Sequence, residues 1–432
     1  MPKRAGFFFS LLTLVLLLMP QLSLAQTNAA GAQAGGQQNN FAGGFGPTWI
    51  NGDAWYGLYL VPEFSFGKIG LGLRVDLQYN PKTGQIRPGT KKWEKGSDYI
   101  KAIRYVRYGQ KRDFIYGRIG GLTDSYVAHG LIMYHYTNEL SYDDRKVGLE
   151  LGLNMKKGGF EAITSNLSES DVVGARVFYR PLEGRIGIPI IKKLTVGASY
   201  VTDLNDAAAD SGGSKVSIWG PDLELPFLST PLFETMLYSD FAKITNHGQG
   251  AAFGIMGVLK GIVGGNLGLS AKFERRELGK EFIPGYFGTL YEKERFGSGM
   301  RKSDTIELFK KPISGYFGEL SATVLGKITV LGNYQDYNGD NVLGVIHVVA
   351  DAPSLVPKAV LTGTYDKAGI KDFGDAWKLN ENSIMRVEVG YRLNPFLVFV
   401  TEYRWNFVYD PVTNTYKTQK RISPRVMLSY KF

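Results

Sequence analysis

The side chains that could do chemistry in this chain are charges placed two residues apart. Residues two apart on a strand share one face, so each such pair lies together. One interpretation is a ladder of charges that keeps strands in register beside water. The other is that Arg and Lys, which outnumber Asp and Glu on the polar side of the alternating segments below, favour anionic solutes in an aqueous interior. Three such pairs, together with the arginines at positions 176 and 180 on the same polar side, are the candidates for lining a pore: Arg74, Asp76, Arg176, Arg180, Arg386, Glu388, Glu402 and Arg404.

Metal ligation is the next chemistry to consider. His129 and His135 share the parity of a strand with Glu139, so together they could be imagined as a metal site. Polar residues in an interior or a loop explain the same pattern without a metal. Residues 336–347 resemble a calcium loop, but Asn341 stands where Gly is required and His347 where Glu is required. We therefore predict no bound metal and no other cofactor.

A serine nucleophile is the remaining candidate for catalysis. Ser125 and His129 lie four residues apart, but a catalytic triad is defined by geometry in space and not by sequence spacing. No serine of the chain sits in a G-x-S-x-G elbow. The absence of Cys excludes disulfide, thiolate-metal and Cys-nucleophile chemistry. We predict that the chain is not an enzyme, and an outer-membrane hydrolase is the alternative.

Elements that alternate with period two must position these side chains. Between Lys68 and Asn80, aliphatic side chains and Tyr79 occupy one parity, and Gly and polar residues occupy the other. This spacing forms one apolar face on a strand but scatters around a helix. The same pattern returns in segments 146–156, 173–180, 194–200, 267–274 and 385–393. The sequence predicts an all-β chain of strands about nine to thirteen residues long, separated by Gly, Asn, Asp and Pro.

The first residues have the features of a targeting segment. Lys3 and Arg4 precede an apolar run over 7–19, and the small residues Ser23 and Ala25 then stand before Gln26. This arrangement is typical of a secretory signal peptide, which we place at residues 1–25. The following residues are rich in Ala, Gly, Gln and Asn, so we expect a flexible segment or a short plug over 26–53. The strand pattern then defines a domain over 54–432.

Alternating strands suit either a soluble sandwich or a membrane barrel whose apolar parity faces lipid. Aromatic residues gather at strand ends, as Trp and Tyr do at the two membrane interfaces, although cross-strand pairing in a soluble sheet also uses such rings. The last strand pattern decides for the barrel. Residues 421–432 alternate and end on Phe432, with Tyr430 two residues before it and Arg425 further back.

This ending resembles the closing strand of bacterial outer-membrane β-barrel proteins, where such aromatic residues form the signal read by the barrel-assembly machinery. Arg425, Tyr430 and Phe432 match that assembly signal, whereas Met427 stands where the pattern prefers Gly. The resemblance is to a class of proteins and implies a transmembrane antiparallel up-and-down β-barrel in the outer membrane. At roughly 20–27 residues per strand, the length allows 14–18 strands, and even counts favour 16.

From this resemblance we expect a porin-like channel or passive transporter for small hydrophilic solutes, leaning towards anions. A non-conducting structural, adhesive or assembly barrel is the alternative. Lipids and lipopolysaccharide are expected partners, since the basic segment 82–95 could contact their anionic headgroups. Nucleic acid is not expected, because no nucleic-acid-binding fold is indicated despite the net charge of +10. A homo-oligomer is left open.

Overall fold

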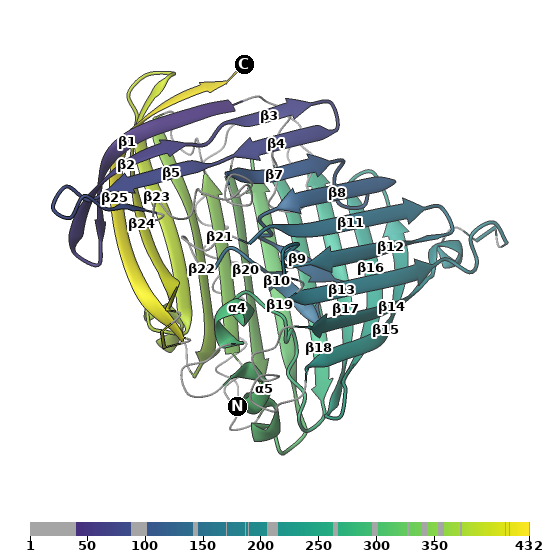
Figure 1. The fold of residues 1–432 in the computed structure, drawn as a ribbon. Helices are drawn as coiled ribbons and strands as arrows, with labels where there is room; N and C mark the ends of the chain where they lie inside the picture. Colours follow the sequence, from purple (N-terminus) through teal and green to yellow (C-terminus); the bar gives the residue numbers. More distant parts are fainter. Residues whose placement is uncertain are drawn as a thin grey trace.

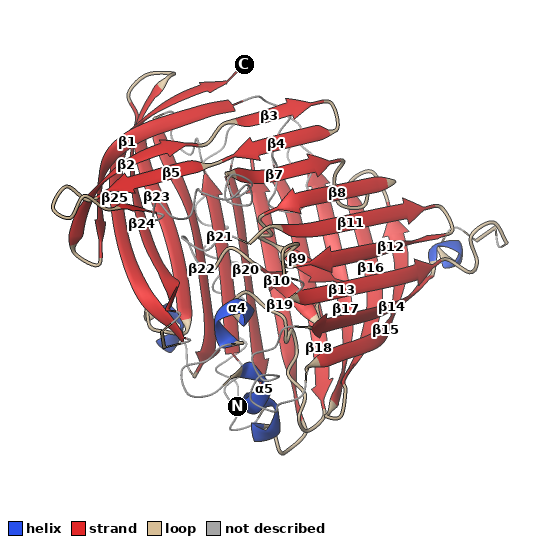
Figure 2. Cartoon of the chain, viewed as in Figure 1, coloured by secondary structure: helices blue, strands red, loops and turns tan. Residues whose placement is uncertain are grey.

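The computed structural model describes most of the chain from residue 40 onwards. The described residues are 40–87, 102–140, 146–169, 171–185, 187–188, 190–204, 215–261, 267–295, 301–325, 328–338, 344–352, 358–371, 374–410, 412–413 and 415–431. The expected signal peptide over 1–25, and the part of the expected flexible segment over 26–39, lie outside the described residues. Strands dominate the described part of the chain (Figure 2), so the prediction of an all-β, mostly antiparallel fold is confirmed.

One large sheet contains 23 strands. Its first part comprises β1 (Asn40–Ile50), β2 (Asp53–Leu60), β3 (Glu63–Phe66), β4 (Ile69–Leu73), β5 (Val75–Tyr79), β6 (Ile86–Arg87), β7 (Ile103–Tyr108), β8 (Ile115–Gly120), β11 (Gly148–Met155), β12 (Gly158–Thr164), β13 (Val172–Tyr179) and β14 (Thr195–Asp203). Its second part comprises β15 (Ser217–Ser229), β16 (Phe233–Ile244), β17 (Gln249–Gly261), β18 (Leu267–Leu278), β19 (Ile313–Val324), β20 (Ile328–Tyr337), β21 (Gly344–Ala352), β22 (Ala359–Ile370), β23 (Ser383–Arg392), β24 (Leu397–Asp410) and β25 (Thr415–Lys431).

The strands of this sheet pair antiparallel, mostly with the next strand along the chain. The first and last strands also pair, because β1 lies between β2 on one side and β25 on the other, with Asn40 opposite Lys431 and Ile50 opposite Arg421. The sheet curves strongly, so β7, β8 and β11–β15 cross in front of β16–β20 in Figure 1. An expected strand number of 16 is wrong, since the described residues form 25 strands. Connections such as that between Met155 and Gly158 are much shorter than the estimate assumed.

Residues 40–50 also correct the expectation of a flexible or plugging segment over 26–53. They form β1, a full member of the sheet. Gly43, Gly44 and Gly46 lowered the apparent strand propensity there. At Gly44 and Gly46 a Cβ atom would lie within 2.5 Å of a β25 carbonyl oxygen, so glycine permits the close approach of the two strands.

Burial along the strands is opposite to that of a water-soluble sheet. In β13, Val177 and Tyr179 are exposed, whereas Arg176 is buried. The neighbouring strand β14 exposes Val196 and Tyr200 in the same way. The pattern continues around the sheet, with large apolar side chains outside and charged ones inside, including Asp222, Asp240, Lys272, Glu274, Arg276, Glu402 and Arg421. The outer face therefore presents an apolar surface, and the inner face is polar.

Two long connections fill part of the inside. The first follows β8 and carries the two-stranded sheet of β9 (Ser125–Val127) and β10 (Met133–Tyr136). The second follows β18 and contains α4 (Tyr291–Glu294), α5 (Lys302–Thr305) and the 3-10 turn η4 (Ile306–Leu308). Apolar residues of both connections share one buried cluster with inward residues of β12–β18, including Leu122, Met133, Ile163, Val201, Ile218, Phe282 and Phe287. The short turns η2 (Ile191–Lys193) and η5 (Asp375–Trp377) lie elsewhere.

The connection between β8 and β11 touches three separate strands of the large sheet. Ser125 donates to Glu150 of β11 at 2.6 Å, and the His129 ring bonds to Asp240 of β16 at 2.6 Å. Tyr134 donates to Glu319 of β19 at 2.7 Å. This connection therefore crosses the space enclosed by the sheet and is held to strands on different sides of it. We call residues 121–140 the inner loop.

Candidate functional site: an arginine-lined cavity

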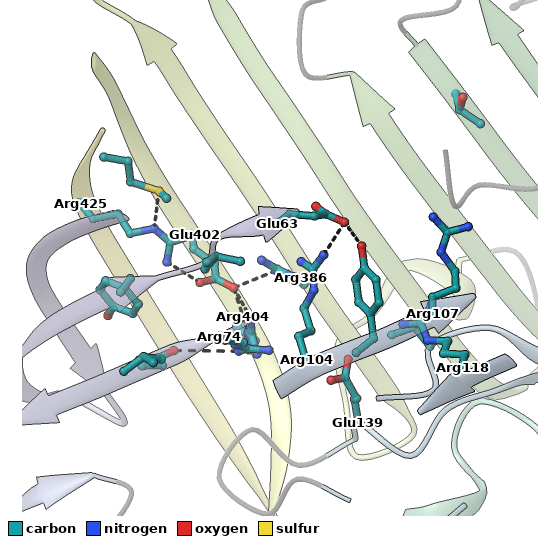
Figure 3. Close-up of a pocket in the computed structure, with 18 of the residues that line it drawn as sticks. Glu63, Arg74, Arg104, Arg107, Arg118, Glu139, Arg386, Glu402, Arg404 and Arg425 are labelled. Carbon is teal, nitrogen blue, oxygen red and sulfur yellow. Dashed lines mark hydrogen bonds and ion pairs between the residues drawn. The ribbon is translucent and has the colours of Figure 1, made fainter. Parts of the chain in front are cut away.

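A cavity of about 540 Å³ remains open on the inner face beside the inner loop. Its charged lining comes from both ends of the chain: Glu63 of β3, Arg74 and Asp76 at β5, Arg104 and Arg107 of β7, Arg118 of β8, Glu139 of the inner loop, Arg386 of β23, Glu402 and Arg404 of β24, and Arg425 of β25. Figure 3 shows these side chains converging from two groups of strands. Arginines outnumber carboxylates in this lining, so we call it the arginine cavity.

Glu402 organises the arginines on one side of the arginine cavity. Its carboxylate accepts hydrogen bonds from Arg425 Nη1 at 2.9 Å and from Arg404 Nε at 3.0 Å, and it forms an ion pair with Arg386 Nε at 2.9 Å. The Glu402 side chain is almost fully buried. Arg425 also reaches Glu388 at 2.7 Å. One buried carboxylate thus holds three guanidinium groups together, although like charges repel at such distances.

The other side of the arginine cavity is formed by β7 and β8. Arg104 lies 3.2 Å from Glu63, which also accepts a hydrogen bond from the Tyr105 hydroxyl. Arg107 donates to the backbone oxygen of Gly109 at 2.8 Å, and Arg118 donates to that of Gly121 at 3.1 Å. Within the described residues, the structure records no ion pair for Arg107. The positive charge on this side is therefore only partly neutralised.

A further arginine lies behind the arginine cavity and supports its wall. Arg421 of β25 is fully buried and donates to the hydroxyl groups of Tyr59 and Ser423, both at 3.1 Å. Asp76 lies 3.5 Å from the same guanidinium group. These contacts join β25, β2 and β5 across the pairing of the chain's two ends. They fix the position of Asp76 at the edge of the arginine cavity.

Most of the sequence-predicted residues meet in this place. Arg74, Asp76, Arg386, Glu402 and Arg404 line the arginine cavity, and Glu388 accepts a hydrogen bond from its Arg425. The sequence analysis assigned Arg425 to an assembly signal, and the structure places its side chain among the cavity arginines. The side chains of Tyr430 and Phe432 lie outside the described residues.

The two remaining candidates lie elsewhere. Arg176 is buried against Asp222 and Glu224, with Nη2–O distances of 2.5 and 2.6 Å. Arg180 donates to the backbone oxygen of Met155 at 2.8 Å and to the Asn154 side chain at 3.1 Å, at the end of β13. Neither residue contributes to the arginine cavity.

Sequence reasoning missed Arg104, Arg107 and Arg118. Arg104 and Arg107 have opposite parity on β7, so a strict alternation would send only one of them inwards. The pairing of β4 with β7 shifts between Gly72 and Leu73, because Gly72 lies opposite Tyr105 and Leu73 lies opposite Ile103. Arg104 is the extra residue of this bulge, and a bulge re-aims side chains. Both arginines therefore reach the arginine cavity.

The His residues considered as metal ligands have other partners. His129 and His135 do not join Glu139, since His129 binds Asp240 and the two ring nitrogens of His135 reach Asp124 at 2.6 Å and Glu319 at 3.0 Å. Ligand atoms of His129, Asp222 and Glu224 do lie within 4.8 Å of one another. However, the Arg176 guanidinium already binds both of those carboxylates, so these residues do not fit a cation as well.

The residues considered for hydrolysis are also engaged elsewhere. The Ser125 hydroxyl donates to Glu150, and His129 bonds to Asp240, so the described contacts do not form a serine–histidine pair. His347 of the predicted turn bonds to Asp366.

His135 and Asp124 of the inner loop have shifted pKa values. Burial lowers the pKa of His135, but the carboxylates of Asp124 and Glu319 outweigh it and raise the pKa to about 10. Burial raises the pKa of Asp124, but the charge and hydrogen bond of His135 bring it well below its usual range. The inner loop is therefore held by ionised groups at neutral pH.

Among the described residues, no helix has the length and apolar composition needed to cross a membrane.

Comparisons with known proteins found similar solved structures only at low agreement. No protein-family model matches the chain, and no curated protein matches it. The outer membrane protein OpdK from Pseudomonas aeruginosa has 10% identical residues and a TM-score of 0.34, covering 91% of this chain and 99% of its own. OccK11 (OpdR) of the same organism has 11% identity and a TM-score of 0.32 over 91% and 95% of the two chains. OccAB2 from Acinetobacter baumannii has 9% identity and a TM-score of 0.32 over 91% and 98%. At this level of agreement, the function of this chain has to be inferred from its own residues.

Proposed function

We propose that this chain is a transmembrane β-barrel of the bacterial outer membrane that acts as a porin-like channel for small hydrophilic solutes and prefers anions. The observation that carries the proposal is an arginine-lined cavity on the inner face of a sheet whose outer face is apolar. A polar inside and an apolar outside suit a barrel with lipid around it and water within.

The strand pairing supports the barrel. An open sheet would leave the outer edges of its first and last strands without backbone partners, which is costly in lipid. Here β1 and β25 are paired over most of β1. The exposed side chains next to this pairing, such as Phe45 and Leu428, are apolar. The seam between the two ends of the chain is thus also suited to contact with lipid.

Selectivity follows from the lining of the arginine cavity. The inner loop and the connection carrying α4 pack against β12–β18, while the arginine cavity stays open. We therefore expect a solute to pass beside the arginines. Lining charges of one sign raise the local concentration of counter-ions, and low-dielectric walls strengthen this effect. Glu402 reduces the net charge but also holds three arginines close together in front of the solute.

The test is single-channel conductance of the refolded protein in planar bilayers, with the reversal potential measured in a salt gradient. We expect stable steps and a reversal potential that indicates preference for the anion. Arg107→Glu should shift the reversal potential towards the cation, because the charge of Arg107 faces the arginine cavity. Arg180→Glu is the matched control, since Arg180 lies outside the arginine cavity and should leave the reversal potential unchanged.

Silence from protein that is demonstrably refolded would contradict the channel and favour a non-conducting barrel. One observation favours that second candidate: the buried apolar cluster joins both inner connections to β12–β18 and fills that part of the interior. Conductance that responds equally to Arg107→Glu and Arg180→Glu would retain the channel but reject the arginine cavity as its selective part.

A further inference from the structure

The connection between β13 and β14 differs from its neighbours at the same end of the sheet. Gly158 of β12 lies opposite Tyr179 of β13, so this connection begins beside the two-residue turn between β11 and β12. The turn between β3 and β4, from Phe66 to Ile69, is equally short and lies at the same rim. The connection between β13 and β14 runs from Tyr179 to Thr195 and projects beyond the strands at the right of Figure 1.

This projecting connection exposes large apolar side chains. Ile188, Ile190 and Ile191 are 52%, 43% and 40% exposed. The backbone around them is folded into turns, because the amide groups of Lys192 and Lys193 donate to the carbonyl oxygens of Ile188 and Ile190 at 3.1 and 3.2 Å. Three exposed isoleucines therefore lie close together on a backbone folded into turns, and such a group of exposed apolar side chains marks a surface that contacts something.

The same connection is basic. Arg185 and Lys193 are exposed, and Lys192 is partly exposed. Glu183 is the acidic residue of the connection, and its side chain is turned towards Lys156 at 3.8 Å and is only 14% exposed. Isoleucines beside uncompensated lysine and arginine match the interface of a membrane, where apolar side chains reach the acyl boundary and cations meet anionic headgroups.

The position of the isoleucines continues the apolar outer face. They lie in the chain between Tyr179 at the end of β13 and Val196 of β14, and both of these side chains are exposed on that face. We propose that the connection between β13 and β14 is an anchor in the anionic phospholipid headgroups of one membrane leaflet. That leaflet lies at the end of the sheet that carries the short turns β3–β4 and β11–β12, which we call the short-turn rim. The anchoring side chains are those of Arg185, Ile188, Ile190, Ile191, Lys192 and Lys193. This inference rests on the proposed barrel. The rim is that of the short turns, which face the periplasm in outer-membrane barrels.

The experiment uses the absence of cysteine in the chain. A single Ile190→Cys substitution in the full-length protein accepts one environment-sensitive fluorophore, because no other Cys is present. The labelled protein is refolded into phosphatidylcholine vesicles with or without phosphatidylglycerol. Quenching is then measured with headgroup-spin-labelled lipid and with iodide in the water. We expect lipid quenching of the Ile190→Cys label that increases with phosphatidylglycerol, and weak quenching by iodide.

Lys192→Gln with Lys193→Gln, added to Ile190→Cys, tests the charge. The preference for phosphatidylglycerol should fall by roughly fivefold for each lysine removed, since one basic residue near an anionic surface contributes about that factor. Val412→Cys is the matched control: Val412 is 91% exposed in the turn between β24 and β25, away from this basic cluster. Phosphatidylglycerol should not change its quenching.

The outcomes separate the two proposals. Val177→Cys, at a side chain 60% exposed on the apolar face of β13, should carry a label that is quenched by lipids spin-labelled on the acyl chain. If the Val177→Cys label is not quenched, the membrane barrel itself fails. If that label is quenched but the Ile190→Cys label is quenched by iodide and not by lipid, the anchor is overturned and the barrel is retained. Lipid quenching of the Ile190→Cys label that ignores phosphatidylglycerol would overturn the role of the lysines.

Discussion

Two groups of buried charge lie on the inner face of the same sheet, and they differ in what covers them. Around Arg176, one guanidinium faces Asp222 and Glu224, and the inner loop packs His129 onto the neighbouring Asp240. In the arginine cavity, several guanidinium groups share Glu402, and 540 Å³ of space remains in front of them. The two groups therefore differ in packing and in charge: the inner loop covers the surroundings of Arg176, whereas it only borders the arginine cavity, through Glu139, and leaves open space beside an excess of arginines.

The largest expected effect comes from breaking the packed group. Arg176→Met should lower the free energy of unfolding by about 3–5 kcal/mol, because Asp222 and Glu224 would remain buried without their cation. Urea unfolding of the refolded protein, followed by tryptophan fluorescence, measures this. The reversal potential of molecules that still fold should not change. A shift as large as that of Arg107→Glu would mean that Arg176 faces the solute after all.

The next effect tests how the arginine cavity is held. Glu402→Gln should cost about 1–3 kcal/mol of stability, since three guanidinium groups lose their charged acceptor. It should also move the reversal potential further towards the anion, because one negative charge leaves the lining. Stability and reversal potential are measured on the same preparation. A shift towards the cation would contradict the assignment of Glu402 as a partial neutraliser of the arginines.

A smaller effect concerns the inner loop and pH. His135 has a raised pKa of about 10, against an ordinary value of 6.5, so the stability that its charge contributes is complete below about 6.5 and is lost as pH rises through about 10. Asp124, with its lowered pKa, stays ionised throughout that range. Current noise in single-channel records should therefore increase between neutral pH and pH about 10. His135→Gln should remove this pH dependence, and noise that rises equally in the variant would reject the role of His135.

The smallest effect is expected at the end of β13. Arg180→Gln should change stability by less than about 0.5 kcal/mol and leave conductance unaltered, because Arg180 is only partly buried and bonds mainly to backbone oxygens of the neighbouring turn. Thermal unfolding and conductance together test this. A changed conductance would mean that the solute path reaches Arg180 at the short-turn rim. The arginine cavity would then not be the only group of charges that faces the solute.

Alternation along single segments predicted the inward parity of some of these side chains but not of all. The parity of Arg386 and Glu402 is set within β23 and β24, because side chains alternate on any strand, and both side chains line the arginine cavity. Their role in lining a pore stays a prediction. The inward position of Arg104 was not predicted, because Arg104 lies at a shift in register that depends on the partner strand β4. The position of Arg176 outside the arginine cavity was not predicted, because the inner loop that covers its surroundings is placed by contacts with distant strands. The number of strands was not predicted correctly, because it depends on the lengths of turns, and the sequence pattern of a short turn says little about its length.

The pairing of β1 with β25 imposes an order on assembly. Other strand pairs in the large sheet join segments close in sequence, but Asn40 and Lys431 meet only after the whole intervening chain has been made. The entropy of closing a loop increases with the logarithm of its length, so this contact is the costliest to form early, and it becomes much cheaper once the intervening strands are ordered. The Arg421 guanidinium group meets its partners Tyr59 and Asp76 only when that contact exists. The last step of folding should therefore be the one that completes the wall of the arginine cavity, and an incompletely assembled molecule would lack that wall.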